Sequence, residues 1–452
     1  MVLPKEENLV YGIKLSSIGP GRSTGSDTVH DLSNMDLAMK LHYLKVVYFF
    51  NSNAAQGLTI LRMKETMFDW LNEYYYTSGR LRRLESGRPY IKCNDCGSRF
   101  IEAQCDKTID EFLEMKDSSL QNLLVSQQVI GPELSFSPLV LIQVTRFKCG
   151  GMSLGLSWAH ILGDAFSASE FINRWGQIVS GIWPNKTPNF PKPGTQTESE
   201  SESERSRSKN LPLSKDKDPL FVKQVDPVGD HWITSNSYKM DTFWFPISAS
   251  QLATIRAEIS GENQFDQIPI FESLCAIIWK CVVKVRERAP PKIVTICKSD
   301  PRKPTSGNLR NTQIISTVEA GFSITKETGP KKLATLLINQ AVDERSQIEE
   351  LVERDHGVSD FIVYGAKLTF VDSEEANFYG LELNGHKPDF VYQSIQGVGD
   401  EGVVFVLPEP KDSCKNKNDR GRIVTIIFPE NQMVELRSEL VKNGLLLDGN
   451  LA

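Results

Sequence analysis

Long apolar runs are missing from this sequence of 452 residues. The longest of them, such as residues 46–50 and 139–142, fall far short of the roughly 18 apolar residues that a membrane-spanning helix needs. The first residues, MVLPKEENLVYGIKLSS, carry charges where a signal peptide has an uninterrupted apolar segment. We therefore expect no signal peptide and no membrane span, and any contact with a membrane would be peripheral or through a partner.

A strong net charge is missing as well. The chain has 51 basic and 57 acidic residues, which gives a net charge of -6. Because nucleic acid is bound by clustered basic surface, this balance disfavours a nucleic-acid partner. An apolar content of 40% and a charged content of 24% are typical of a globular protein. The length predicts two domains of about 200 residues each.

Motifs of metal, nucleotide and serine-nucleophile chemistry are absent too. No G-x-S-x-G, Walker loop, His-Glu-x-x-His or G-x-G-x-x-G follows a predicted strand, so those classes are disfavoured. The eight cysteines are scattered, mostly inside apolar segments, and we expect reduced thiols that pack as small core residues. The C-x-x-C of Cys93 and Cys96 has no second ligand pair and no thioredoxin-like context. We interpret it as a turn between two strands and expect no metal site.

One segment stands apart in composition. Residues 184–230 are rich in Ser, Glu, Lys and Pro and contain few apolar side chains. Such a segment cannot bury enough apolar surface to offset the entropy of ordering it. We interpret it as a flexible crossover linker between an N-terminal domain, residues 1–183, and a C-terminal domain, residues 231–452.

Strand and helix patterns alternate in both domains. The N-terminal patterns predict strands and helices, in chain order, over residues 11–18 (strand), 35–50 and 59–76 (helices), 88–94, 98–105, 139–149 and 152–159 (strands). The C-terminal patterns predict strands over 237–247, 292–297, 366–371, 388–394, 401–408 and 421–428. They predict helices over 248–259, 270–286 and 430–444, and more than one helix between residues 331 and 353. The tight turn at residues 149–151 implies at least one antiparallel hairpin. This mixture predicts an α/β fold in which helices flank mixed sheets.

Only six histidines occur in the chain. His160 alone follows a strand with alternating apolar residues and precedes a helix that begins at Asp164. A neutral imidazole near pH 7 accepts a proton from a hydroxyl or an amine, which is the general-base step when an acceptor attacks an acyl thioester. His160 is therefore the candidate catalytic residue. We interpret His42, inside a predicted helix, as a packed or surface histidine and His386 as an exposed loop histidine.

Asp164 lies four residues after His160 and has two interpretations. Its carboxylate could orient the imidazole, or it could fix the turn by capping the helix or by pairing with a basic group. We favour the structural role. The expected basic partner comes from residues 298–303, with Arg302 as the first candidate.

Three blocks resemble the plant BAHD acyl-CoA-dependent acyltransferases. They are LNEYYYTSGRLRR, CNDCGSRFIEA and SPLVLIQVTRFKCGGMSLGLSWAHILGDAFSASEFINRW, the last of which holds the family's His-x-x-x-Asp motif. The resemblance covers essentially the whole chain outside the linker. It implies the two-domain, chloramphenicol acetyltransferase-like fold with a channel between the domains, His160 as general base and Asp164 as structural support. It also implies acyl-CoA as a substrate or ligand, with no bound cofactor.

The family's second motif is degenerate in this chain. Where the family has Asp-Phe-Gly-Trp-Gly followed by Lys-Pro, residues 382–388 read ELNGHKP. The Ser-Trp pair that precedes this motif is Thr369 and Phe370, and the glycine after the motif aspartate is Ala165. Thr369 and Lys387 are the candidates for contact with the coenzyme. Because a loosely held site loses most of its rate, the resemblance leaves open whether the chain is an enzyme.

LSWAHILGD, MDLAMKLHY and NGHKPDFV occur together here, which is similar to the eceriferum (glossy) subgroup of the family. That similarity implies a role in very-long-chain fatty acyl-CoA elongation for cuticular wax, as an accessory of the elongase condensing enzyme, a ketoacyl-CoA synthase. It implies a cytoplasmic monomer that lies at the endoplasmic reticulum through this partner. The alternative is an acyl-CoA-dependent O- or N-acyltransferase with His160 as its base.

Overall fold

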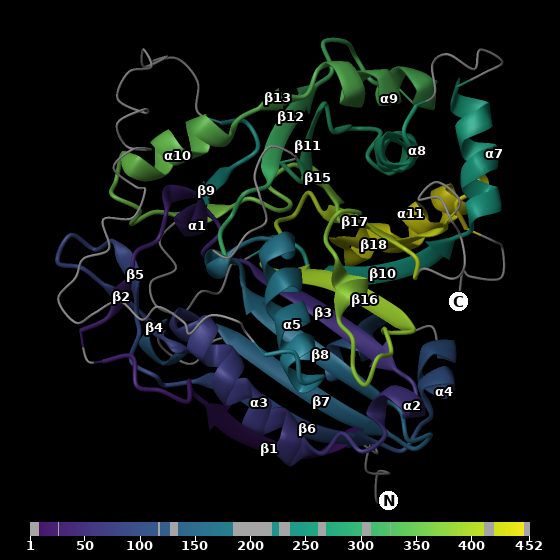
Figure 1. The fold of residues 1–452 in the computed structure, drawn as a ribbon. Coiled ribbons are helices and arrows are strands. Elements are labelled where there is room, and N and C mark those ends of the chain that lie inside the picture. The colour runs from purple at the N-terminus through teal and green to yellow at the C-terminus, as the bar shows by residue number, and fades with distance from the viewer. Residues whose placement is uncertain are drawn as a thin grey trace, which may run out of the picture.

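Two mixed sheets flanked by helices make up the molecule (Figure 1), which confirms the predicted fold class. The computed structural model describes residues 9–25, 27–115, 118–126, 134–183, 219–225, 236–260, 268–300, 309–325, 327–410 and 420–446.

The first sheet has six strands, and the only parallel neighbours in it are β6 and β7. In spatial order they are β1 (Val10–Ile18), β6 (Ser98–Cys105), β7 (Val140–Phe147), β8 (Met152–Ala159), β3 (Tyr43–Phe50) and β16 (Phe390–Gln396). β16 comes from the second half of the chain and pairs with β3 from Phe390 to Gln396. The two halves are therefore joined by main-chain hydrogen bonds as well as by side chains.

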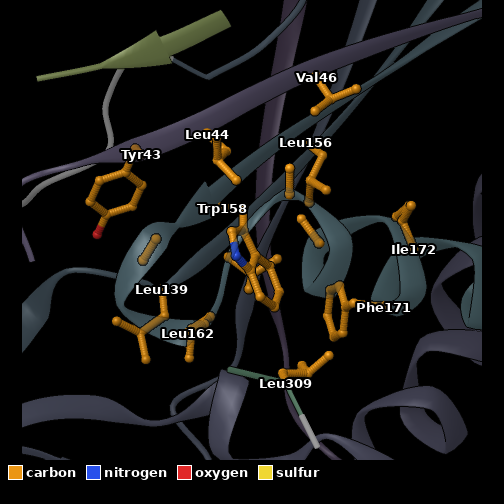
Figure 2. Packing of buried hydrophobic residues seen from close by; sticks show 14 of the residues in the cluster. Tyr43, Leu44, Val46, Leu139, Leu156, Trp158, Leu162, Phe171, Ile172 and Leu309 are labelled. Atoms are coloured by element: carbon orange, nitrogen blue, oxygen red, sulfur yellow. The ribbon is translucent and has the colours of Figure 1, made fainter. Parts of the chain in front are cut away.

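Two helices cover one face of this sheet. They are α3 (Ile60–Glu73) and α5 (Ala165–Val179), which lie side by side in Figure 1. Trp70 of α3 stacks on Trp175 of α5, with ring centroids 5.5 Å apart, and meets Phe171 at 4.0 Å. Figure 2 shows Trp158 of β8 reaching the same core, where its indole donates to the carbonyl of Gly163 at 2.8 Å. This packing fixes the start of α5 against the end of β8.

The second sheet has seven strands. In spatial order they are β10 (Met240–Ile247), β18 (Arg422–Pro429), β17 (Val403–Pro408), β15 (Leu368–Asp372), β11 (Ile293–Lys298), β12 (Ile314–Glu319) and β13 (Val342–Asp343). The helices that pack with it are α7 (Ala249–Ser260), α8 (Ile270–Val285), α9 (Pro330–Asn339) and α11 (Glu430–Lys442). α8 is buried over nearly its whole length, as its apolar sequence predicts.

Smaller elements complete the two halves. They are β2 (Val29–His30), β5 (Pro89–Lys92), β4 (Arg80–Arg83), β14 (Asp360–Ile362), β9 (Lys223–Val225), α1 (Asn34–Ala38), α2 (Ser52–Ala55), α4 (Ile109–Glu114), α10 (Arg345–Glu353) and five short 3-10 helices, η1 (Tyr75–Ser78), η2 (Ser118–Leu123), η3 (Leu134–Phe136), η4 (His160–Leu162) and η5 (Phe378–Gly380). No helix in the described ranges is long and apolar enough to cross a bilayer.

The helix predicted over residues 35–50 is wrong. α1 begins as predicted, because Ser33 caps it in a reciprocal arrangement with Asp36, but it ends at Ala38. From Tyr43 to Phe50 the chain is β3, and all eight of its residues are buried. A strand covered on both faces has a continuous apolar run, so its sequence lacks the alternation that distinguishes it from a buried helix. The β-branched and aromatic residues of VVYFF favour the strand.

Part of the predicted linker has regular structure. β9 pairs with β14 through Lys223, Gln224 and Val225. Residues 184–218 and 226–235 lie outside the described ranges, so the predicted domain boundaries stay a prediction. Cys93 and Cys96 lie in the turn between β5 and β6, as predicted, and the cysteines of the described ranges are free thiols.

Candidate functional site

His160 begins the short 3-10 helix η4 directly after β8. Its main-chain N–H donates to the carbonyl of His42 at 3.0 Å, which continues the pairing of β8 with β3. Gly163 ends η4 with φ 147°, and a Cβ at this position would come within 2.6 Å of Ser167 and 3.0 Å of the Arg310 nitrogen. Only glycine fits this turn, so the strand-to-helix geometry predicted around His160 is built into the chain.

The His160 ring is completely enclosed. The residue has 0% exposure, and its Nε2 lies 2.9 Å from the Tyr364 hydroxyl. The same phenol oxygen accepts from the Gln313 amide nitrogen at 2.8 Å and lies 3.1 Å from the Gln313 amide oxygen, so the phenol proton has both Nε2 and that oxygen as acceptors. The ring therefore has no solvent-exposed surface in the conformation described.

Burial also decides the charge of His160. It lowers the pKa of His160 to about 4, against smaller opposing contributions from its own carbonyl, Asn311 and Asp36. The imidazole is thus neutral at pH 7, as a general base must be. Its Nε2 nevertheless already has a hydrogen-bonding partner within the protein, the Tyr364 hydroxyl.

A second buried imidazole lies beside the first. The rings of His42 and His160 are 6.5 Å apart, and both residues have 0% exposure. Nε2 of His42 accepts from the Val363 N–H at 3.0 Å, so the ring proton is on Nδ1. Burial and the neighbouring His160 lower the pKa of His42 to about 3. His42 is a packed histidine, as predicted, but it belongs to the surroundings of the site.

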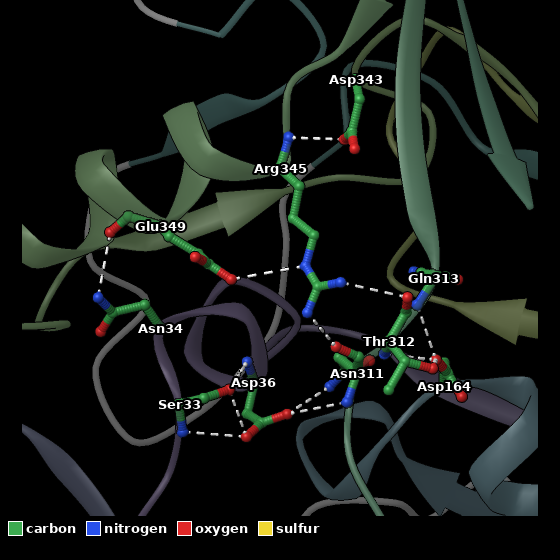
Figure 3. Close-up of polar contacts among 10 residues, drawn as sticks. All are labelled: Ser33, Asn34, Asp36, Asp164, Asn311, Thr312, Gln313, Asp343, Arg345 and Glu349. Carbon is green, nitrogen blue, oxygen red and sulfur yellow. Dashed lines mark hydrogen bonds and ion pairs between the residues drawn. The ribbon is translucent and has the colours of Figure 1, made fainter. Parts of the chain in front are cut away.

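Asp164 caps helix α5 and also holds a distant segment (Figure 3). Its Oδ1 accepts from the Ser167 N–H at 3.1 Å. Its Oδ2 accepts from the N–H groups of Thr312 at 2.7 Å and Gln313 at 3.0 Å, and from the Thr312 hydroxyl at 3.1 Å. Burial raises the pKa of Asp164, and these donors oppose the rise. Both oxygens are used by groups other than the imidazole, which is the arrangement the structural role requires.

The expected basic partner of Asp164 is not found among the described residues. Lys298, the first residue of the stretch that was expected to supply it, forms an ion pair with Glu272. Arg302 and Lys303 lie outside the described ranges. The sequence prediction missed the main-chain N–H donors of residues 312 and 313, because every residue except proline has such a group and no side chain distinguishes these two.

Residues 309–313 form a segment that clamps the turn of His160, as Figure 3 shows in part. The Asn311 amide donates to the His160 carbonyl at 2.9 Å and to the Asp36 carboxylate at 2.8 Å. The Arg345 guanidinium donates to the carbonyls of Asn311 and Thr312 at 3.2 and 3.3 Å. The segment thereby joins α1, the start of α5 and α10 around one histidine.

The structure separates the two candidates for coenzyme contact. Thr369, with 0% exposure, accepts from the Gly365 N–H at 3.1 Å and donates to the Lys367 carbonyl at 2.8 Å. It therefore holds the turn that carries Tyr364. Lys387 lies at the surface and pairs with Glu382 at 3.5 Å, next to the exposed His386. A role for either residue in coenzyme binding stays a prediction.

The site thus consists of a histidine between β8 and α5 and an aspartate that caps α5, in a fold of two helix-flanked sheets. The model of the Transferase family matches residues 12–442. The chain therefore belongs to this family, the BAHD acyltransferases, as its sequence motifs suggest.

Within the family, the chain is similar to Protein ECERIFERUM 26 of Arabidopsis thaliana. The two are 41% identical over 439 residues, which is 97% of this chain and 96% of the relative. This similarity confirms the eceriferum type.

Two solved structures show the same fold at low identity. Vinorine synthase superposes with a TM-score of 0.66 at 17% identity and covers 96% of this chain and 98% of its own. F. sporotrichioides TRI101, complexed with coenzyme A and T-2, superposes with a TM-score of 0.64 at 14% identity and covers 91% of this chain and 97% of its own.

Proposed function

We propose that this protein acts in very-long-chain fatty acyl-CoA elongation for cuticular wax, as an accessory of the elongase condensing enzyme, a ketoacyl-CoA synthase. Similarity over nearly the full length to an ECERIFERUM protein supports the wax role. The hydrogen bond of 2.9 Å between His160 Nε2 and the Tyr364 hydroxyl supports the accessory mechanism. It is the observation on which this proposal depends most.

The physical reason is that Tyr364 and an external acceptor would compete for the same atom, Nε2 of His160. A general base must come within about 2.6–3.2 Å of the atom whose proton it takes. Tyr364 already holds that distance, and the enclosed ring leaves no exposed surface for an external acceptor. An accessory role needs no proton transfer, so the closed site is compatible with it. In this role acyl-CoA is a ligand, and the protein reaches the endoplasmic reticulum through the condensing enzyme.

The alternative is an acyl-CoA-dependent O- or N-acyltransferase with His160 as general base. The firmly built turn favours this alternative, whereas the pKa lowered to about 4 makes the neutral imidazole a weak base. It requires Tyr364 to leave His160 during turnover, so that an alcohol or amine takes its place.

Complementation with His160→Ala separates the two functions. A plant that lacks the corresponding activity receives the wild-type chain, His160→Ala or the matched control His386→Ala, and wax chain length is scored. The accessory function predicts full rescue by all three. A transferase would lose a factor on the order of 10² to 10⁴ in rate. Loss of rescue by His160→Ala alone, with the protein folded and present at wild-type level, contradicts the accessory function.

A further inference from the structure

Tyr364 reaches His160 from the other half of the chain. It lies between β14 and β15, and 204 positions separate it from the histidine. Its ring centroid is 5.4 Å from that of His160 and 5.1 Å from that of His42, which it meets edge-on at 88°. Tyr364 has 1% exposure, and its ring contacts both imidazoles.

The turn that carries Tyr364 is held from both sides. The Gly399 N–H donates to the Tyr364 carbonyl at 2.9 Å, and the Gly365 N–H donates to Thr369. Gly365 has φ 83°, and a Cβ there would come within 2.5 Å of the Gly399 oxygen. These contacts hold the backbone from which the phenol extends to His160.

The phenol hydroxyl has the relation to His160 that a reacting hydroxyl needs. It lies at hydrogen-bond distance from Nε2, 2.9 Å, and its oxygen is oriented by the Gln313 amide at 2.8 Å. We infer that Tyr364 occupies the acyl-acceptor position at His160 and determines which acceptors the site admits. In the conformation described it admits none, and removal of the side chain opens a place for a small phenol. This inference goes beyond the accessory function, because it concerns what the closed site does once it is opened.

Replacing Tyr364 by glycine removes the phenol side chain and nothing else from this position. Free phenol then takes the vacated place and donates its hydroxyl proton to His160 Nε2. The phenol oxygen attacks the thioester carbonyl of an acyl-CoA, the C–S bond breaks, and the imidazolium returns the proton to the thiolate. The products are a phenyl ester and free coenzyme A.

Chemical labelling tests the position of Tyr364 without any acyl-CoA. The full chain is treated with diethyl pyrocarbonate, and peptides with His160 and the exposed His386 are followed by mass spectrometry. Wild type is expected to be labelled at His386 and protected at His160. Tyr364→Gly is expected to be labelled at both residues at similar rates. Protection of His160 in a folded Tyr364→Gly variant overturns the inference.

Turnover with phenol tests the acceptor position itself. Coenzyme A release and phenyl ester formation are measured with a long-chain acyl-CoA and phenol for wild type, Tyr364→Gly and Tyr364→Gly/His160→Ala. Ester is expected only with Tyr364→Gly, and the second substitution is expected to reduce it by about 10² or more. A His160 that is labelled but forms no ester, or ester that survives His160→Ala, overturns the assignment.

Tyr364→Phe keeps the test decisive if the glycine variant does not fold. The ring stays in place, and the hydrogen bonds of the hydroxyl to His160 and Gln313 are lost; without a phenol beside neutral Nε2, NMR is expected to show a higher pKa for His160. Tyr48→Phe is the matched control, because Tyr48 is equally buried and its hydroxyl has no partner among the described residues. An unchanged His160 pKa in Tyr364→Phe overturns the inference. None of these assays uses the condensing enzyme, so their failure is distinct from failure of the wax complementation.

Discussion

Replacing Asp164 by alanine removes four hydrogen bonds from one buried carboxylate. One is the cap of α5 through Ser167, and three go to Thr312 and Gln313. Loss of the cap costs about 1 kcal/mol. The main-chain N–H groups of Thr312, which is part-buried, and Gln313, which is buried, are left without an acceptor, at about 1–3 kcal/mol each. We therefore expect Asp164→Ala to lower the free energy of unfolding by about 3–7 kcal/mol.

Urea denaturation followed by circular dichroism measures this loss. The midpoint should fall while the slope of the transition is kept, because the surface exposed on unfolding is nearly unchanged. Thr59→Ala is the matched control. Thr59 caps the comparable helix α3 by one bond, at 3.1 Å to the Arg62 N–H, from an exposed position. It should lose about 1 kcal/mol. Equal losses of unfolding free energy in the two variants would refute the role of Asp164 in holding residues 312 and 313.

Three further predictions concern the surroundings of the site. Burial sets the pKa of His160 at about 4 and that of His42 at about 3, below the unfolded value of 6.5. Because its folded pKa lies below its unfolded pKa, each histidine stabilises the fold above pH 6.5. This stabilisation is lost as the pH falls toward the folded pKa and is on the order of 3 kcal/mol for His160. Denaturation midpoints between pH 7 and pH 4 should fall more steeply for wild type than for His160→Gln. Parallel curves would contradict the contribution of His160 to this pH dependence. Lys40 and Asp360 form a buried ion pair at 2.5 Å, so Lys40→Met should cost about 3–5 kcal/mol in urea titrations. The double variant Lys40→Met/Asp360→Leu should recover most of that loss, and a single variant as stable as wild type would contradict the pairing. Gly163→Ala meets Ser167 and Arg310 and should cost about 2–4 kcal/mol in thermal unfolding, whereas Gly181→Ala, with φ 84° and open space, should cost about 1 kcal/mol. Similar melting temperatures for the two variants would show that the turn at residue 163 accommodates a Cβ.

Local sequence patterns predict the parts of the site that are local in the chain. The strand, turn and helix around His160 depend on spacings within residues 152–179, and Asp164 is a typical capping residue. β3 was missed because its buried, continuously apolar run has no periodicity of its own. Alternation of apolar and polar residues identifies the buried face of a strand, and a strand buried on both faces has no such alternation.

The contacts that close the site cannot be predicted from local patterns. Tyr364 meets His160 across 204 positions, and the Val363 N–H meets His42 across 321. Each pairing depends on how β14, β15 and the segment around Gln313 lie against the first sheet. No motif or spacing connects residues so far apart in one sequence, so only the structure identifies the partners of His160.

The central claim is that this chain works with a condensing enzyme while His160 stays out of chemistry. Co-expression of a ketoacyl-CoA synthase with the wild-type chain, with His160→Ala or with no partner, followed by measurement of acyl chain length, tests it most directly. The account predicts the same shift to longer chains with wild type and His160→Ala. A shift with wild type that is absent with a folded His160→Ala chain would contradict it.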